Sequence, residues 1–285
     1  MKVLVTGGSG YLGTHVRRFF GADDLSRRSG KDVLIRQDAA IASEYDLVIH
    51  MAANLDRSSA GEEKNFETQV AGTINILRSM REGAAFIYLS TKDIYGRFAD
   101  NYFDVPETVP VSYSGQSSFE WSKFIAEKYV EYYANARGFR SCIFRLSSAY
   151  APMSEGNRPS FAGHYANAIN LGEAIRLPAG GTPIRDILHV DDFARACSAF
   201  FESVIRHGLY NIGGGRANAM SLTDLITKME EVSGLSAVID TDHPLPAPVP
   251  LNYVTDTSLI MLELDWEPQI AVEDGLRTLF SAHDA

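Results

Sequence analysis

Residues 3–13 read VLVTGGSGYLG, and this stretch decides the fold. Apolar and β-branched residues come first, and glycines follow at positions 7, 10 and 13. Glycines at this spacing after a strand let backbone amides approach a pyrophosphate at the N-terminus of the next helix. The stretch therefore predicts the strand, turn and helix with which a dinucleotide-binding domain begins.

Strand-like apolar runs alternate with helix-like stretches over the first 150 residues. The expected strands are 2–6, 47–50, 85–90 and 141–145, and the expected helices are 11–20, 64–80 and 119–136. This order is typical of a parallel sheet covered by helices. We therefore expect an α/β fold, with a Rossmann-type doubly wound parallel sheet over 1–150. The remainder, 151–285, should form a smaller C-terminal substrate-binding lobe, with 181–212 returning to the first domain.

Composition narrows the classes of partner. Lys and Arg number 26 and Asp and Glu number 36, which gives a net charge of −10 over 285 residues. Nucleic-acid binding needs cations against the phosphates, so nucleic acid and anionic membranes are disfavoured. No run of about 18 apolar residues is present, and the first residues lack the long apolar core of a signal peptide.

Cysteine and histidine usage points away from metal sites and disulfides. Cys142 and Cys197 both stand among apolar residues, which favours buried free thiols and a cytoplasmic location. The seven histidines show no metal-ligand spacing, so we expect no metal.

Acidic and basic residues after the first helix bear on the choice of dinucleotide. A second strand should end in an acid that accepts hydrogen bonds from the adenosine ribose, and Asp23 is our candidate. Only ten residues separate it from Gly13, against about twenty in the usual pattern, so the first helix and second strand must be short. Asp38 follows the next expected short strand and could contact adenine. Arg27 and Arg28 could instead hold a 2′-phosphate, which keeps NADP open, or all these charges could be solvated.

Eight motifs in order along nearly the whole chain resemble the extended short-chain dehydrogenase/reductase family. They are TGGSGYLG (6–13), HMAAN (50–54), STKDIYG (90–96), the Ser122-Lys123 pair, RLSSAYAP (145–152), IRDILHVDD (184–192), YNIGGG (210–215) and DTSLIMLELDWEP (256–268). Three of them, STKDIYG, RLSSAY and RDILHVDD, are most similar to CDP-paratose/tyvelose 2-epimerases. UDP-sugar 4-epimerases and hexose dehydratases are near relatives.

The resemblance implies an NAD-dependent nucleotide-sugar epimerase. Such an enzyme oxidises a sugar carbon transiently to a ketone and returns the hydride to the opposite face, so NAD is recycled. The resemblance also implies a homodimer formed through the helices at 64–80 and 119–136, with Phe66, Tyr129 and Tyr133 as candidate contacts. The implied cofactor-binding residues are Gly7, Gly10, Tyr11, Leu12, Gly13, Asp23, Ser26, Arg27, Asp38, Ala39, Met51, Ala52, Ala53, Ser90 and Lys123.

The family's catalytic set is a Ser or Thr, a Tyr, and a Lys four residues after the Tyr. By that pattern Thr91 takes the hydroxyl position and Lys123 the lysine position, where its charge would lower the pKa of the tyrosine and its ammonium would hold the nicotinamide ribose. Phe119 stands where the tyrosine belongs and has no proton to exchange. Since a general acid–base group contributes about 10² to 10⁴ in rate, we expect the family's reaction to be impaired.

Phe119 has two interpretations. It is an engineered Tyr→Phe exchange that traps substrate, or a natural loss in which another residue serves or catalysis has lapsed. The intact cofactor and substrate motifs around it favour the engineered exchange. The other interpretation, a natural loss, keeps a non-catalytic dinucleotide-binding protein as an alternative.

Dehydratases of the family carry Asp-Glu directly after the threonine, where this chain has Lys92 and Asp93. Asp93 could act as a base, which keeps a 4,6- or 5,6-dehydratase open, although no partner acid follows the threonine. Ser148 stands where many sugar epimerases have asparagine and is expected to face the sugar. Arg185 is expected to bind the nucleotide diphosphate, or else to form a surface ion pair with its neighbour Asp186.

The proline-rich connector LPAPVPLNYV contains no arginine, whereas the family often has a second nucleotide-binding arginine there. This absence leaves the nucleotide open. The four prolines between positions 244 and 250 also favour an extended connector over a helix.

Overall fold

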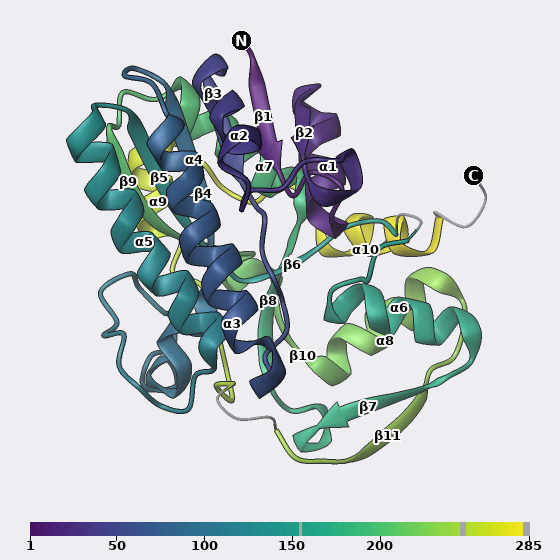
Figure 1. Ribbon diagram of the computed structural model, residues 1–285. Coiled ribbons are helices and arrows are strands. Elements are labelled where there is room, and N and C mark those ends of the chain that lie inside the picture. Colours follow the sequence, from purple (N-terminus) through teal and green to yellow (C-terminus); the bar gives the residue numbers. More distant parts are fainter. Residues whose placement is uncertain (154–155, 246–248, 282–285) are drawn as a thin grey trace.

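The structure is a computed structural model that describes residues 1–153, 156–245 and 249–281. A parallel six-stranded sheet in the order β2-β1-β3-β4-β5-β9 forms its centre, with helices on both faces (Figure 1). Its strands are β1 (Val3–Thr6), β2 (Asp23–Leu25), β3 (Leu47–His50), β4 (Ala85–Thr91), β5 (Arg140–Leu146) and β9 (His207–Ile212). The predicted α/β fold with a doubly wound parallel sheet is confirmed.

The helices around this sheet divide between its faces. Helices α1, α7 and α9 pack on one face, and α4 and α5 with the short helices before β3 pack on the other. They are α1 (Tyr11–Phe20), α2 (Arg36–Ala39), α3 (Glu62–Asn65), α4 (Thr73–Ser79), α5 (Ser118–Arg137), α7 (Val190–Glu202) and α9 (Ser258–Leu264), with the shorter helical segments η1 (Arg27–Ser29), η2 (Ala40–Glu44), η3 (Ser59–Gly61) and η5 (Lys92–Asn101).

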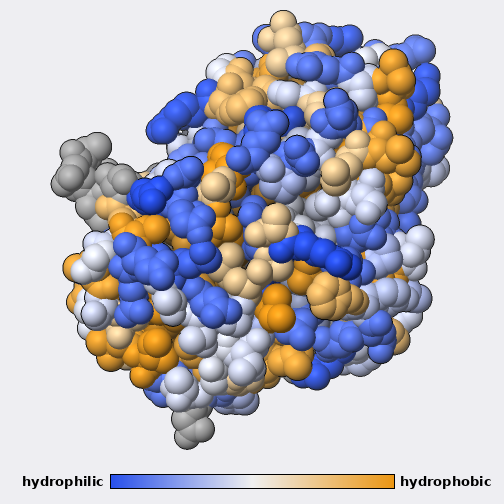
Figure 2. All heavy atoms as spheres, turned by 180° about the vertical axis from the view of Figure 1, so that it is seen from behind, coloured by the Kyte–Doolittle hydropathy of each residue, from blue (hydrophilic) through white to orange (hydrophobic). Residues whose placement is uncertain are grey.

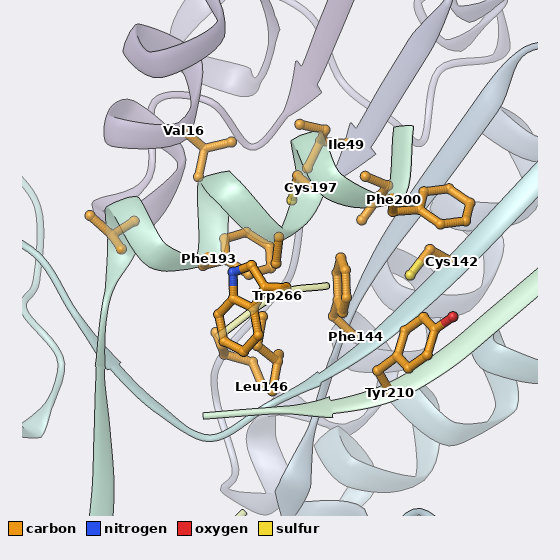
Figure 3. Packing of buried hydrophobic residues seen from close by; sticks show 14 of the residues in the cluster. Val16, Ile49, Cys142, Phe144, Leu146, Phe193, Cys197, Phe200, Tyr210 and Trp266 are labelled. Atoms are coloured by element: carbon orange, nitrogen blue, oxygen red, sulfur yellow. The ribbon is translucent and has the colours of Figure 1, made fainter. Parts of the chain in front are cut away.

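The core between α7 and the sheet is rich in aromatic side chains (Figure 3). Phe144 of β5 meets Phe193 of α7 edge to face at a centroid distance of 5.9 Å. The ring of Tyr210 of β9 lies on the other side of Phe144, at a centroid distance of 6.1 Å. Cys142 and Cys197 are buried in the same core as free thiols. Burial of these rings fixes β9 against β5, although 60 residues lie between the end of β5 at 146 and the start of β9 at 207.

The first crossover is shorter than that of a full doubly wound sheet. Helix α1 ends at Gly21 in the left-handed conformation, and β2 follows after one residue. The segment 32–38, which was expected to hold a short strand before Asp38, instead forms a turn and α2. That expectation is wrong because Leu34 and Ile35 are exposed and pack against no sheet edge.

One long helical segment crosses the second face in three pieces. Helix α3 continues into the π-helix η4 (Phe66–Gly72) and then into α4. It packs along α5, which begins with a capping box between Ser117 and Glu120 and ends at Gly138 in the left-handed conformation.

The rest of the described chain forms a second, smaller layer. A three-stranded sheet β10-β8-β6 and a two-stranded sheet β11-β7 pack with three helices around their own apolar cluster. Its members are β6 (Ser148–Tyr150), α6 (Phe161–Leu171), β7 (Ala174–Pro178), η6 (Ala179–Gly181), β8 (Ile184–His189), η7 (Arg216–Asn218), β10 (Ala219–Ser221), α8 (Leu222–Ser233), β11 (Val238–His243) and α10 (Val272–Ser281). The expected extended connector lies partly outside the described residues.

Hydrophobic residues are scattered among hydrophilic ones on the face opposite to that of Figure 1 (Figure 2). Within residues 1–153, 156–245 and 249–281, the longest helices are too short or too polar to cross a bilayer.

Candidate active site

The glycine-rich turn between β1 and α1 depends on two close backbone approaches. Gly7 has φ +71°, and a Cβ there would lie 2.9 Å from the backbone nitrogen of Ala52. A Cβ at Gly13 would overlap the carbonyl oxygen of Gly7. The backbone N–H of Gly10 donates to that same carbonyl at 2.9 Å, which tightens the turn. The first amides of α1 therefore face open space, as anion binding at a helix N-terminus requires.

A cavity of about 530 Å³ opens over this turn and reaches the carboxyl ends of β3 and β4. A dinucleotide fits this cavity, because the glycines let it approach the backbone closely at one end and polar groups line the other end. The predicted residues that line it are Gly7, Gly10, Tyr11, Leu12, Gly13, Ser26, Arg27, Met51, Ala52, Ala53, Ser90, Thr91, Phe119 and Lys123. Those that do not line it are Asp23, Asp38, Ala39, Asp93, Ser148 and Arg185.

The acid that lies against the glycine-rich turn is Asp24, not Asp23. Asp23 is at the exposed start of β2 and accepts a hydrogen bond from the hydroxyl of Tyr45 at 2.8 Å. Asp24 accepts hydrogen bonds from Ser9 at 2.5 Å and Ser26 at 2.8 Å, while its other oxygen is buried without a partner. The sequence analysis missed Asp24, because the choice between adjacent acids depends on the register of β2 against β1.

Other residues chosen for the adenosine side have structural partners. Arg28 donates to the carbonyls of Ser9 and Gly156 and to Asn157, so it ties the loop after β6 to the glycine-rich turn. Asp38 lies in α2 and accepts the backbone N–H of Asp32 at 2.8 Å. Ala39 is buried in the core beside the second face.

The buried side chain of His50 links three elements beneath the cavity. Thr73 donates to the carbonyl of Gln69, so it accepts from Nε2–H of His50 at 2.9 Å, and Nδ1 of His50 accepts from Thr6 at 2.7 Å. Burial, with a smaller contribution from Lys123, lowers the pKa of His50 to about 3. The ring is therefore a neutral link between β1, β3 and α4.

The far end of the cavity brings together the three positions of the family's catalytic set. Thr91 ends β4, and Phe119 and Lys123 stand one turn apart on α5. The ammonium of Lys123 donates to the carbonyl of Leu89 at 2.7 Å and lies 5.0 Å from the ring centroid of Tyr88. Burial lowers the pKa of Lys123 to about 7, against a smaller opposing effect of Glu127. Phe119 is 5% exposed.

A chain of four charges runs past Phe119. The guanidinium of Arg57 lies 4.9 Å from the Phe119 ring centroid and pairs with Glu120 at 3.0 Å. It also pairs with Asp93 at 2.5 Å, and Asp93 pairs with Lys92 at 2.6 Å. Burial alone would raise the pKa of Asp93, but the two cations outweigh burial and lower it. Arg57 had no sequence signal, since it comes from the irregular segment between β3 and α3.

A second buried ion pair anchors α5 to the sheet. Glu127 accepts from Arg145 at 2.8 and 3.1 Å and from Ser90 at 2.5 Å. Arg145 also donates to the hydroxyl of Tyr95 at 2.8 Å. Glu127 stands four residues after Lys123, so helical spacing offered a signal for it that the sequence analysis did not use.

The two expected substrate-side residues lie in the three-stranded sheet, outside the cavity lining. Ser148 is buried in β6. Arg185 is 8% exposed and donates to the carbonyls of Ile184, Leu251 and Pro250, so a surface ion pair with Asp186 is wrong. The carboxylate of Asp186 instead accepts from Ser147 and from two backbone N–H groups. Among the described residues, no group of three or more acidic, Cys or His side chains could hold a metal.

Comparisons with known proteins agree with this architecture. The chain is 26% identical to CDP-paratose 2-epimerase of Salmonella typhi, over 98% of both chains. It is 28% identical to dTDP-glucose 4,6-dehydratase of Mycobacterium tuberculosis, over 98% of this chain and 92% of that protein.

Among solved structures, UDP-glucose 4-epimerase of Thermotoga maritima with UDP-glucose matches with a TM-score of 0.85 at 23% identity, covering 99% of this chain and 98% of that one. UDP-glucuronic acid 4-epimerase of Bacillus cereus, in complex with UDP-glucuronic acid and NAD, matches with a TM-score of 0.83 at 22% identity, over the same shares. The model of the NAD dependent epimerase/dehydratase family matches residues 3–213, which confirms the predicted family and its cofactor, NAD. The chain belongs to the NAD dependent epimerase/dehydratase family, within the extended short-chain dehydrogenases/reductases.

Proposed function

We propose that the chain is an NAD-dependent epimerase of a nucleotide-activated sugar. One observation carries the proposal: a single cavity joins the glycine-rich turn to Thr91, Phe119 and Lys123. When bound, NAD supplies a hydride acceptor that oxidises a sugar carbon to a ketone and returns the hydride to the opposite face.

Residues of this chain would hold the cofactor by backbone and hydroxyl groups. The turn at 7–13 presents amides to the pyrophosphate. The hydroxyls of Ser9 and Ser26, held by Asp24, are placed to bind the adenosine ribose. Lys123 would bind the nicotinamide ribose. On the substrate side, Arg185 would bind the diphosphate and Ser148 the sugar, as the family resemblance implies.

The state of Asp93 favours epimerisation over dehydration. A base that removes a proton from a sugar carbon must have a free carboxylate and a pKa near the working pH. Asp93 is held by Lys92 and Arg57, which lower its pKa. A 4,6- or 5,6-dehydratase is the second candidate, supported by the 28% identity to a dTDP-glucose 4,6-dehydratase.

Phe119 allows two interpretations of the activity of this chain. An engineered Tyr→Phe exchange that traps substrate fits the complete cavity around it. A natural phenylalanine fits equally with a dinucleotide-binding protein without turnover. Restoring the tyrosine separates these two interpretations.

A homodimer and a cytoplasmic location stay predictions. Exposed aromatic side chains support the dimer: Phe66 of η4 is 54% exposed, and Tyr129 and Tyr132 of α5 are 39% and 63% exposed. Tyr133 instead accepts a hydrogen bond from Arg78 at 3.1 Å. Sedimentation of the protein and of Tyr132→Glu should give a dimer and a monomer, and a monomer for both would contradict the prediction.

Mass spectrometry of the small molecules released on denaturation tests the ligand class. We expect NAD together with a nucleotide sugar. Phe119→Tyr is then assayed with UDP, CDP, GDP and dTDP sugars, and the products are identified by NMR. An inverted sugar supports the epimerase, and a keto sugar formed with loss of water supports the dehydratase. NADP or no dinucleotide at all would overturn the proposal.

A further inference from the structure

The reaction end of the cavity has one titratable side chain among six of its lining residues. These are Ser90, Thr91, Phe119, Lys123, Leu146 and Ser147. Oxidation of an alcohol to a ketone releases a proton as well as a hydride, so a group there must accept it. Phenylalanine has no site for a proton, and serine and threonine hydroxyls are too weakly basic to keep one. Lys123 is left.

We propose that Lys123 takes the place of the absent tyrosine as the proton-transfer group of this chain. This rests on the proposed epimerase function. In the oxidation step the sugar O–H bond breaks and its proton moves to the neutral amine of Lys123, while the C–H bond breaks and its electron pair leaves as hydride to NAD⁺. The products are a ketone, NADH and the ammonium of Lys123. In the return step the ammonium gives its proton to the alkoxide oxygen as hydride returns to carbon.

The electrostatic surroundings of Lys123 favour a neutral amine. Its side chain is buried at 3% exposure, and few charges face it. Among the residues that the structure describes, Glu127 on the same helix is the carboxylate that acts on it, and its oxygens already bind Arg145 and Ser90. From β3 it faces neutral His50, and from β4 the ring of Tyr88. With a pKa of about 7, Lys123 has both the neutral amine and the ammonium available near neutral pH, which suits base and acid roles in turn.

Hydrogen-bond geometry leaves the lone pair of a neutral Lys123 available. The nitrogen donates one proton to the carbonyl of Leu89 at 2.7 Å. The Tyr88 ring faces it at 5.0 Å and accepts no proton. The lone pair can therefore face the cavity that Lys123 lines. Thr91 accepts the backbone N–H of Asp93 at 3.2 Å and keeps its own proton to orient the sugar oxygen.

Four proteins test the proposal: the present chain, Lys123→Arg, Phe119→Tyr and the double variant. Arginine keeps the positive charge that holds a ribose but does not give up its proton. We expect Lys123→Arg to lower turnover at least about 100-fold in the present chain. With tyrosine at 119 the phenol transfers the proton, so the same exchange should cost less than about tenfold there.

Equal losses in both backgrounds would show that Lys123 only positions ligands and would overturn the proposal. Turnover in Phe119→Tyr with none in the present chain would also overturn it, because Lys123 then transfers no proton. A failure of the proposed function is distinct, since neither background would then convert any nucleotide sugar. Calorimetric titration with NAD and a urea unfolding midpoint confirm that each variant is folded and loaded.

A second readout needs neither cofactor nor turnover. In the free protein labelled with ¹³C at lysine Cε, the resonance absent from Lys123→Arg belongs to Lys123. We expect this resonance to titrate near pH 7, well below the ordinary lysine pKa of about 10.4. A midpoint for Lys123 above about pH 9 would overturn the proposal.

Discussion

The two ends of the cavity differ in how closely they keep the family pattern. The cofactor end, residues 7–13 with Ser26 and 51–53, has every glycine of the motif in place, and Gly7 and Gly13 make close backbone approaches that exclude a side chain. The reaction end, with Thr91, Phe119 and Lys123, lacks the phenol and is flanked by Arg57 and a chain of ion pairs. Binding depends on the backbone, while turnover depends on one proton. A change at the reaction end can therefore abolish turnover and leave cofactor binding intact.

Phe119→Tyr should produce the largest change of all, and only at the reaction end. We expect turnover of the nucleotide sugar to rise about 10²- to 10⁴-fold, equivalent to about 3 to 5 kcal/mol, because the family's phenol then takes over the proton transfer that Lys123 carries alone in the present chain. The measurement is sugar inversion followed by NMR at saturating substrate. Phe119→Leu is the control, since it removes the ring under Arg57 without adding a proton donor. A gain in both variants would mean that packing, not proton transfer, limits the reaction.

The cofactor end was readable from the sequence because its determinants are local. The predicted helix at 11–20 and strand at 47–50 coincide with α1 and β3. The determinants of the reaction end come from distant segments, so Arg57 and its ion pairs could not be foreseen. Asp24 was missed for a related reason, since the register of a three-residue strand is set by its partner β1. The expected short strand before Asp38 did not form, because that segment pairs with no neighbouring strand.

Gly13→Ala should damage the cofactor end and leave the reaction end intact. The added methyl group would overlap the carbonyl of Gly7, so the turn must open. We expect NAD affinity to fall at least about 100-fold, or about 2.7 kcal/mol, by calorimetric titration. Gly21→Ala is the matched control at the other end of α1, where a Cβ meets nothing within 4 Å. It should cost about 1 kcal/mol of stability through its positive φ and leave NAD affinity unchanged.

Acid should lower the free energy of unfolding through His50, which lies beneath the cofactor end of the cavity. His50 stays neutral in the native state with a pKa of about 3, whereas the unfolded chain takes up a proton below about pH 6.5. Its contribution to stability is therefore fully present above pH 6.5 and is lost as pH falls toward 3. Between pH 7.5 and 5 the loss should be about 2 kcal/mol.

Urea unfolding at several pH values measures this loss as a difference between the present chain and His50→Gln. Other histidines titrate in both proteins, so only the difference reports on His50. Parallel pH dependence in the two proteins would assign the acid sensitivity elsewhere.

Asp93→Asn should have the smallest effect on turnover. This exchange tests whether Asp93 acts as a second base at the reaction end. The carboxylate is bound by Lys92 and Arg57, and both keep its pKa low, so it is too weak a base to take a proton from the sugar near neutral pH. We expect turnover per folded molecule to fall less than about tenfold, or 1.4 kcal/mol. Thr91→Val, two residues earlier in the chain, is the matched comparison and should cost about 10²-fold, because it removes a hydroxyl that orients the sugar oxygen. A larger loss for Asp93→Asn than for Thr91→Val would make Asp93 the proton acceptor. The reaction end would then be built for elimination of water, and the dehydratase would replace the epimerase.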